Sequence, residues 1–194
     1  MRDATPGGYL EHDSELGKFS LSSDTILRTF TNHRRMQPII SAVPLEARES
    51  FLTRGYTIGG MIIFPSNRIN NQRTINGARG MHPQIEDRID FTLECIRRHY
   101  ANEPSPLSGA LARYSDFFNL FQDFKGYVRY FLLDDLVSED FMRVKFFLPF
   151  DDFRRTAALP ADLEEYEAFR AAMLQFIEGR NQRIDTWQSV SVSH

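Results

Sequence analysis

Residues 74–100 of the chain read TINGARGMHPQIEDRIDFTLECIRRHY. Apolar residues recur there at positions 85, 89, 93, 96 and 100, and these steps of four, four, three and four place them on one face of a helix. Pro83 suits the first turn of such a helix, because the first amide groups of a helix have no partner inside it. The stretch predicts a helix from Pro83 to Tyr100, preceded by an irregular loop over residues 67–81.

The segments around this helix predict a mostly helical α+β fold with a small sheet. Residues 56–64, rich in β-branched side chains and closed by Pro65, are the best strand, and residues 144–148 before Pro149 are another. The pair Gly59–Gly60 indicates a bulge or a close backbone approach. Further helices are expected over residues 46–54, 107–121 and from 163 onward after Asp162, with a helix start at 138–140 and either a helix or a strand over 127–137.

Length and composition indicate one packed domain. The chain has 194 residues, 42% hydrophobic and including 17 Phe, which is enough for one core and too short for two. We expect a domain over residues 1–184 and a loose tail over 185–194. The single cysteine, Cys95, excludes an intrachain disulfide and a cysteine-based zinc site, and no cofactor is expected. No run approaches the ~18–20 apolar residues of a membrane span, so a cytoplasmic protein without a membrane partner is expected.

The loop over residues 67–82 is the candidate ligand site. It is rich in arginine and asparagine, and it lies between a strand and a helix start, where free amide groups favour an anion. Gly77 and Gly80 would let its backbone turn sharply or approach a ligand. It lacks the Gly-Lys-Ser/Thr of a P-loop. The residues expected to hold a phosphate, directly or by positioning an arginine, are Arg73, Asn76, Arg79, Asp87, Arg88 and Asp90.

Two other interpretations of these residues stay open. The loop asparagines could simply form turns while its arginines pair with helix carboxylates, and Asp87 or Asp90 could then pin Arg79. Alternatively, Asp87, Asp90 and Glu94 form a carboxylate stripe that could hold a divalent metal. The same stripe also fits a solvated helix face whose charges pair with one another, because Glu94 precedes two arginines by three and four residues.

The remaining reactive and aromatic residues predict packing rather than chemistry. Cys95 has His82 and His99 as potential bases, but a free cysteine is more often inert in a core. The aromatic cluster over residues 117–153 could stack nucleic-acid bases. Eight acidic residues over positions 116–152 oppose a phosphate backbone, which favours core packing for the cluster.

Several segments together resemble an uncharacterised bacterial protein family, a domain of unknown function. They are GYTIGGMIIFP (55–65), TINGARG (74–80), IEDRIDFTLECIRRHY (85–100), SPLSGALARYSDFFNLFQDFKGYVRYFLLDDLV (105–137), FFLPFDDF (146–153) and RNQRI (180–184). The resemblance covers nearly the whole chain and implies no activity. It also implies that members carry a further N-terminal segment, so that Met1 would begin inside the usual domain.

Three functional hypotheses follow from the sequence. The first is a binding or regulatory protein that holds a phosphorylated ligand, a nucleotide or nucleic acid, on the loop over residues 67–82. The second is a structural or protein-interaction module without a small-molecule site. The third, a metal-dependent hydrolase or nuclease that uses Asp87, Asp90 and Glu94, ranks below the other two.

Overall fold

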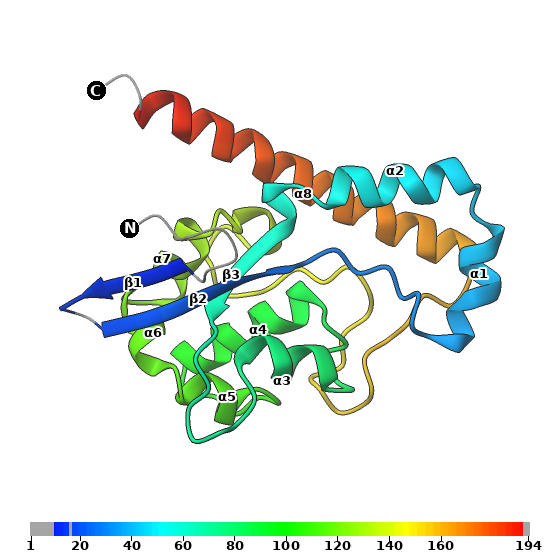
Figure 1. Ribbon diagram of the computed structural model, residues 1–194. Helices are drawn as coiled ribbons and strands as arrows, with labels where there is room; N and C mark the ends of the chain where they lie inside the picture. The colour runs from blue at the N-terminus through cyan, green and yellow to red at the C-terminus, as the bar shows by residue number, and fades with distance from the viewer. Residues whose placement is uncertain (1–9, 16, 192–194) are drawn as a thin grey trace.

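The computed structural model describes residues 10–15 and 17–191 of the chain (Figure 1). Strands β1 (Leu10–Ser14), β2 (Gly17–Thr25) and β3 (Met61–Pro65) form an antiparallel sheet in the order β1-β2-β3. The register places Phe19 opposite His12 and Ser23 opposite Ile63. Among the described residues the fold is a single, mostly helical α+β domain with this small sheet, as the sequence predicts.

The predicted strands are only partly confirmed. In the first, residues 61–65 form β3, but Ile58–Gly60 form a 3-10 turn, η2, that packs against α8 (Leu163–Ser191). A Cβ atom on Gly59 would lie 2.5 Å from the carbonyl oxygen of Ile177, so the expected close backbone approach is present. The strand predicted over residues 144–148 is wrong, because Val144 forms only an isolated bridge to Val137.

The hairpin of β1 and β2 was not predicted as a pair of strands. Its sequence, LEHDS followed by GKFSLSSDT, contains few large apolar residues. Strand β2 nevertheless buries Phe19 and Leu21 on one face, while Lys18 before them is exposed and Ser20 between them is half-buried. The alternation is short, which is why the pattern alone did not distinguish it from a loop.

The helices follow the predicted pattern more closely at their centres than at their ends. They are α1 (Gln37–Ala42), α2 (Leu45–Gly55), α3 (Ile75–Met81), α4 (Ile89–Tyr100), α5 (Ser108–Ala112), α6 (Ser115–Asn119), α7 (Phe124–Tyr130) and α8, with 3-10 turns η1 (Arg34–Met36) and η3 (Asp134–Leu136). The predictions at 46–54 and from 163 are confirmed, and the Asp162 carboxylate accepts the Glu165 amide at 2.9 Å.

Four helix boundaries differ from the prediction. Residues 83–87 form turns and Arg88 is extended, so α4 begins at Ile89 instead of Pro83. The helix predicted over 107–121 is divided into α5 and α6, and no helix starts at 138–140, where Ser138 instead accepts the Arg143 amide. Helix α8 continues through residues 185–191 of the predicted loose tail.

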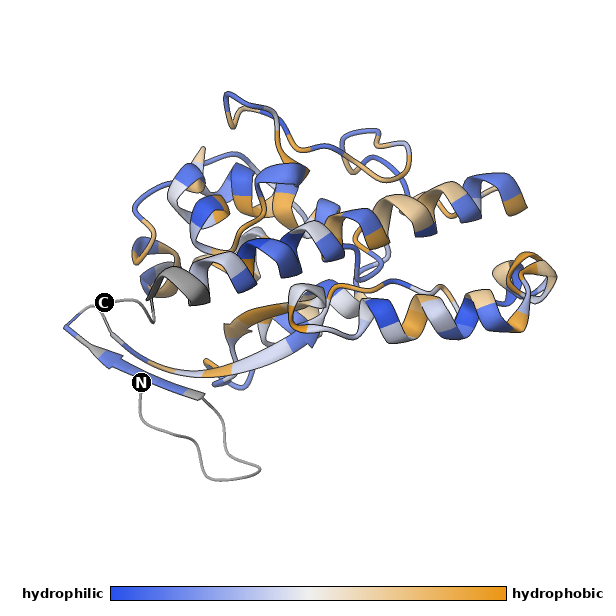
Figure 2. Cartoon of the chain, turned by 90° about the horizontal axis from the view of Figure 1, so that it is seen from above, coloured by the Kyte–Doolittle hydropathy of each residue, from blue (hydrophilic) through white to orange (hydrophobic). Residues whose placement is uncertain are grey.

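One core joins the sheet to the helices. In Figure 1, α2 and α8 lie on one side of the sheet and α3, α4 and α5 lie on the other. Figure 2 shows apolar and polar residues mixed along α8, as expected for a helix with one buried face. The aromatic cluster packs inside, as predicted, with Phe117, Phe118, Phe121, Phe124, Tyr127, Phe131 and Phe153 all buried. None of the described helices is long and apolar enough to cross a membrane.

Candidate functional site

The segment TINGARG is a helix start and not the irregular loop that the sequence predicted. Thr74 caps α3, since its hydroxyl accepts the Gly77 amide at 3.2 Å. Neither Gly77 nor Gly80 has a positive φ, and a Cβ atom on either would make only ordinary contacts. The expectation that these glycines serve a sharp turn or a close approach is therefore wrong.

Arg79 lies in the interior. Its side chain is 0% exposed, and its Nη1 is 3.1 Å from Oδ2 of Asp24 and 3.1 Å from Oδ1 of Asp87. Its Nε donates to the Thr92 hydroxyl at 3.1 Å, and its Nη2 donates to the Asp87 carbonyl at 3.1 Å. The predicted alternative that Asp87 pins Arg79 is confirmed, and this guanidinium is fully enclosed by the protein.

Arg88 and Asp90 form a second, fully buried pair. Both side chains are 0% exposed, and Nε of Arg88 donates to Oδ1 of Asp90 at 3.1 Å. Asp90 also accepts the Phe147 amide at 2.9 Å, and the Arg88 guanidinium lies 3.8 Å from the centroid of the Phe91 ring. The pair joins the start of α4 to the distant 146–158 segment, so both residues hold these two parts of the fold together.

The side chains of Arg73 and Asn76 hydrogen-bond with neither of these two arginine–carboxylate pairs. Arg73 is exposed, and its carbonyl accepts a hydrogen bond from Arg113 at 2.7 Å. Asn76 is half-buried, with its amide nitrogen 3.5 Å from the Ser22 hydroxyl and its Oδ1 buried without a partner. The structure thus brings Arg79 and Asp87 together and Arg88 and Asp90 together, but it does not bring all six predicted residues to one site.

The three carboxylates of the predicted stripe, Asp87, Asp90 and Glu94, are all paired with arginines, although Asp90 and Glu94 are buried where a solvated face was expected. Glu94 is 6% exposed and accepts Arg97 at 2.9 Å and Arg98 at 2.7 Å. Among the described residues, no group of three or more His, Cys, Asp and Glu side chains is arranged to hold a metal. Burial raises the pKa of the Cys95 thiol to about 12, which makes it a poor nucleophile at neutral pH.

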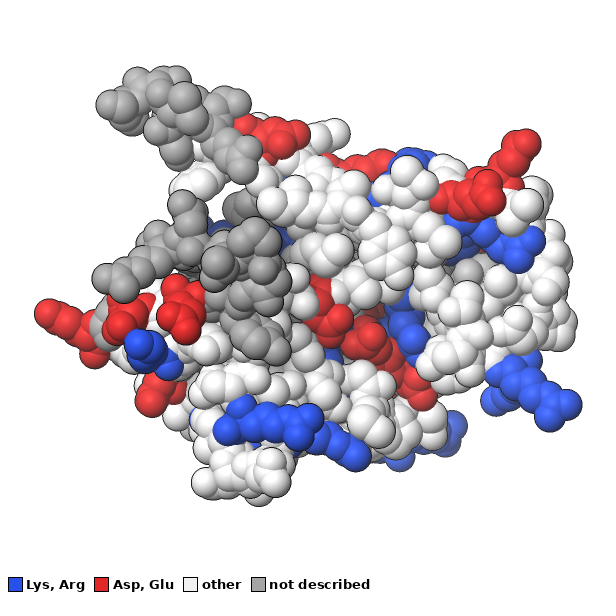
Figure 3. All heavy atoms as spheres, viewed as in Figure 1, with Lys and Arg blue, Asp and Glu red and all other residues white. Residues whose placement is uncertain are grey.

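A mixed charge cluster that the sequence did not indicate lies beside Arg79. Glu86 accepts Arg28 at 3.0 Å and His33 at 2.8 Å through the same oxygen. Glu86 and Asp87 are consecutive non-glycine residues with positive φ, of 51° and 59°, a backbone conformation that stores strain. Burial raises the pKa of Asp87, and Arg79 opposes the shift. Acidic side chains run across a hollow on this face, beside basic ones (Figure 3).

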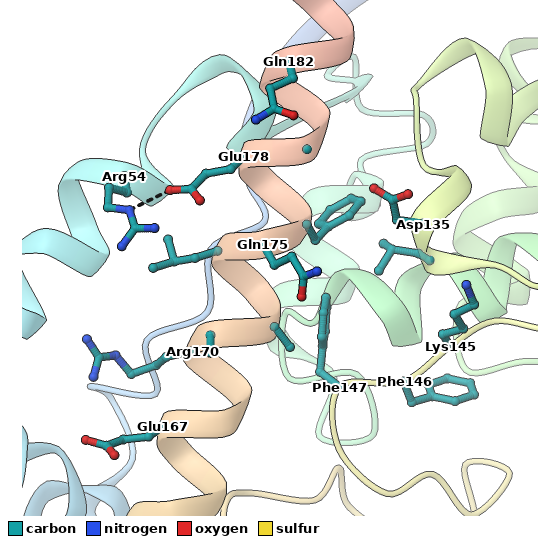
Figure 4. Close-up of a pocket in the computed structure, with 16 residues that line it drawn as sticks. Arg54, Asp135, Lys145, Phe146, Phe147, Glu167, Arg170, Gln175, Glu178 and Gln182 are labelled. Atoms are coloured by element: carbon teal, nitrogen blue, oxygen red, sulfur yellow. Dashed lines mark hydrogen bonds and ion pairs between the residues drawn. The ribbon is translucent and has the colours of Figure 1, made fainter.

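An open groove of about 880 Å³ runs along α8 (Figure 4). Its α2 side carries Arg54, whose Nε donates to Glu178 at 2.6 Å, and Arg170. Arg170 is 9% exposed, and its Nη2 donates to the Ala47 carbonyl. Its Nε is buried without a partner, and no carboxylate of the described residues lies within ion-pair distance of the side chain. Sequence reasoning missed it, although an arginine beside Phe169 on the apolar stripe of α8 was a visible signal.

The fold and this groove define a small, mostly helical α+β protein with an open polar cleft along its longest helix. The chain matches the family of unknown function DUF6994 over residues 1–184, and it belongs to that family. No curated protein and no solved structure matches it.

Proposed function

We propose that the protein is a binding protein whose ligand carries a phosphate or a similar anionic group. The sequence favours a phosphorylated ligand, and the geometry supports a different place for it. Arg79 is paired with two carboxylates, whereas no carboxylate of the described residues pairs with Arg170 in the groove along α8. We therefore propose Arg170 as the residue that receives the anion.

The uncompensated guanidinium of Arg170 carries this proposal. A buried charge is costly unless a counter-charge or a full set of hydrogen bonds offsets it. Arg180, also on α8, is offset by hydrogen bonds, because it donates to the carbonyls of Phe131, Gly59 and Met61. In the part of the chain that the structure describes, Arg170 has only the Ala47 carbonyl as an acceptor, with the rings of Phe51 and Tyr166 at 5.0 and 5.8 Å from its Cζ. An anion in the groove would supply the missing counter-charge.

The charges around Arg170 set how strongly an anion would bind. Half-buried Arg48 also has an Nε without a partner and adds positive charge near Tyr166. Exposed Glu167, three residues before Arg170, lies on the same side of α8 in Figure 4 but makes no ion pair with it. Glu167 repels an anion, so its removal should strengthen binding.

Calorimetric titration and thermal melting with inorganic phosphate and pyrophosphate test the proposal. We expect both anions to raise the melting temperature, because a ligand that binds only the folded state stabilises it. Arg170→Gln should abolish the effect and Glu167→Gln should increase it. Arg155→Gln is the matched control, since Arg155 is 86% exposed outside the groove. No stabilisation of the unaltered protein by either anion would overturn the proposal and favour the interaction module.

The same titration separates the groove from the predicted loop. Arg73→Ala removes an exposed cation of the loop and leaves the groove intact. Loss of anion binding in Arg73→Ala, with binding kept in Arg170→Gln, would place the site on residues 67–82. If the ligand is a nucleic acid, retention on immobilised heparin should fall steeply with salt, because binding releases counterions.

A further inference from the structure

A second cavity, of about 250 Å³, lies between the sheet and helices α6 and α7. The register of the sheet determines which strand residues face this cavity. Phe19 and Leu21 alternate on one face of β2, His12 lies opposite Phe19, and Ile63 lies opposite Ser23 on that same face. All four of His12, Phe19, Leu21 and Ile63 line the cavity.

The helical wall is as regular as the sheet wall. Phe117, Leu120 and Phe121 are three and four residues apart, so they share one face at the end of α6. Phe131 follows the end of α7 and lies 5.3 Å from the ring centroid of Phe121. A protein interior normally leaves few voids larger than a water molecule, so two apolar faces held apart around a space of this size are unusual.

Aromatic edges and faces surround this space. Phe19 meets Phe117 at 5.9 Å and 78°, and Phe117 meets Phe121 at 5.3 Å and 76°, both edge-to-face contacts. A further ring in the cavity would find partners in the same geometry, at the distances that aromatic pairs prefer. The cavity would hold water poorly. Eight of its nine lining side chains are aliphatic or carbon aromatic rings, and a buried water needs several polar partners.

We infer that this cavity is a binding site for a small aromatic molecule. Apolar cavities of roughly 150 Å³ already hold a benzene-sized ligand, so the space suits one ring or two fused rings. Tyr130 marks the entrance, since it lines the cavity and yet is 66% exposed. Its ring lies 5.0 Å from Phe121, close enough to cover a bound ring. The site shares no lining residue with the groove along α8 and is independent of the anion proposal.

Phenol and cyclohexanol form a matched pair of probes, because they have similar size and the same hydroxyl group but only one is aromatic. We expect phenol to raise the melting temperature and to shift the backbone amide NMR signals of Phe19 and Phe121. We also expect phenol to bind a few-fold more tightly than cyclohexanol. Leu120→Phe should fill the cavity and abolish phenol binding. Leu52→Phe, the same exchange on the exposed side of α2, should leave it unchanged.

Three results would overturn the inference. The first is that neither probe changes the melting temperature or the NMR signals of the unaltered protein. The second is equal binding of phenol and cyclohexanol, which would show that ring geometry contributes nothing. The third is phenol binding that persists in Leu120→Phe, which would place the probe elsewhere. An increased melting temperature of Leu120→Phe together with the first result would identify the cavity as a simple packing defect.

Discussion

The interior around α3 and α4 and the groove along α8 both bury arginine, but they differ in the partners that they give it. Arg79 and Arg88 are fully buried, and each meets at least one carboxylate. Arg170 is almost as deeply buried and meets a single carbonyl. The first arrangement joins segments that are distant in the sequence. The second leaves donor capacity unused beside a cavity, which is the more useful indication of a ligand site.

The largest effect should come from breaking a compensated pair. Asp90→Ala leaves the Arg88 guanidinium buried without its carboxylate, so the free energy of unfolding should fall by about 3–5 kcal/mol in urea denaturation. Asp152→Ala is the control, because Asp152 is 54% exposed and pairs with Arg98 at the surface. Its loss should change stability by no more than about 1 kcal/mol. Equal effects of the two substitutions would remove the distinction between buried and surface pairs.

A smaller effect should follow from forcing α8 away from η2. Gly59→Ala places a methyl group 2.5 Å from the Ile177 carbonyl and against Asn181, and overpacking of this kind destabilises by about 1–3 kcal/mol. Gly109→Ala serves as the matched control, since nothing lies within 4 Å of its Cβ position in α5. Gly109→Ala should stabilise the protein slightly. Thermal melting should therefore show a raised melting temperature for Gly109→Ala and a lowered one for Gly59→Ala. A neutral Gly59→Ala would mean that the contact between η2 and α8 adapts easily.

Removing Arg170 tests whether it contributes less to stability than the paired Arg88. In buffer without phosphate, Arg170→Leu should change the free energy of unfolding by less than about 1 kcal/mol, because removing the cost of an uncompensated buried charge offsets the contacts that are lost. The cation–π contact with Phe51 that it loses is of similar size. A loss as large as that of Asp90→Ala, measured in the same urea series, would make Arg170 a structural residue like Arg88.

The smallest effect concerns pH. Burial raises the pKa of Asp87 above its ordinary value, so the folded protein holds this proton more tightly than the unfolded chain does. The stability from this group is fully present below the ordinary pKa and is lost as the pH rises through the folded pKa. Relative to the unaltered protein, Asp87→Asn should therefore gain stability as the pH rises from about 4 towards neutrality.

Urea denaturation at a series of pH values measures this difference. Asp140→Asn should show the opposite trend, because the Ser138 hydroxyl lowers the pKa of Asp140. A difference between Asp87→Asn and the unaltered protein that does not vary with pH would contradict the assignment.

Much of the helical structure could be predicted because local pattern and burial agree. The stripe from Ile85 to Tyr100 is buried over most of α4, and the Asp162 cap fixes the start of α8. The strand predicted over 144–148 failed for the opposite reason. An apolar run before a proline is compatible with a strand, but a strand also needs an available edge, and Val144 finds only Val137.

The candidate site was harder to predict than the fold. Arginine, asparagine and glycine in TINGARG are typical of an anion-binding loop, and the same residue types also cap and pin a short helix. The decisive partner of Arg79 is Asp24, which lies 55 positions earlier in the chain. No local spacing indicates a pair of that kind, so the sequence could suggest Asp87 as a partner but not Asp24.

The amino-acid sequence was enough to predict one mostly helical α+β domain, the central parts of its two longest helices and its family. These properties depend on periodicity, caps and a shared sequence pattern, which can be read along the chain. Which buried arginines are compensated follows only from the folded structure, because their partners come from distant segments. Only packing could reveal that Arg79 is enclosed by carboxylates, that Arg170 is not, and that a ring-lined cavity separates the sheet from α6 and α7.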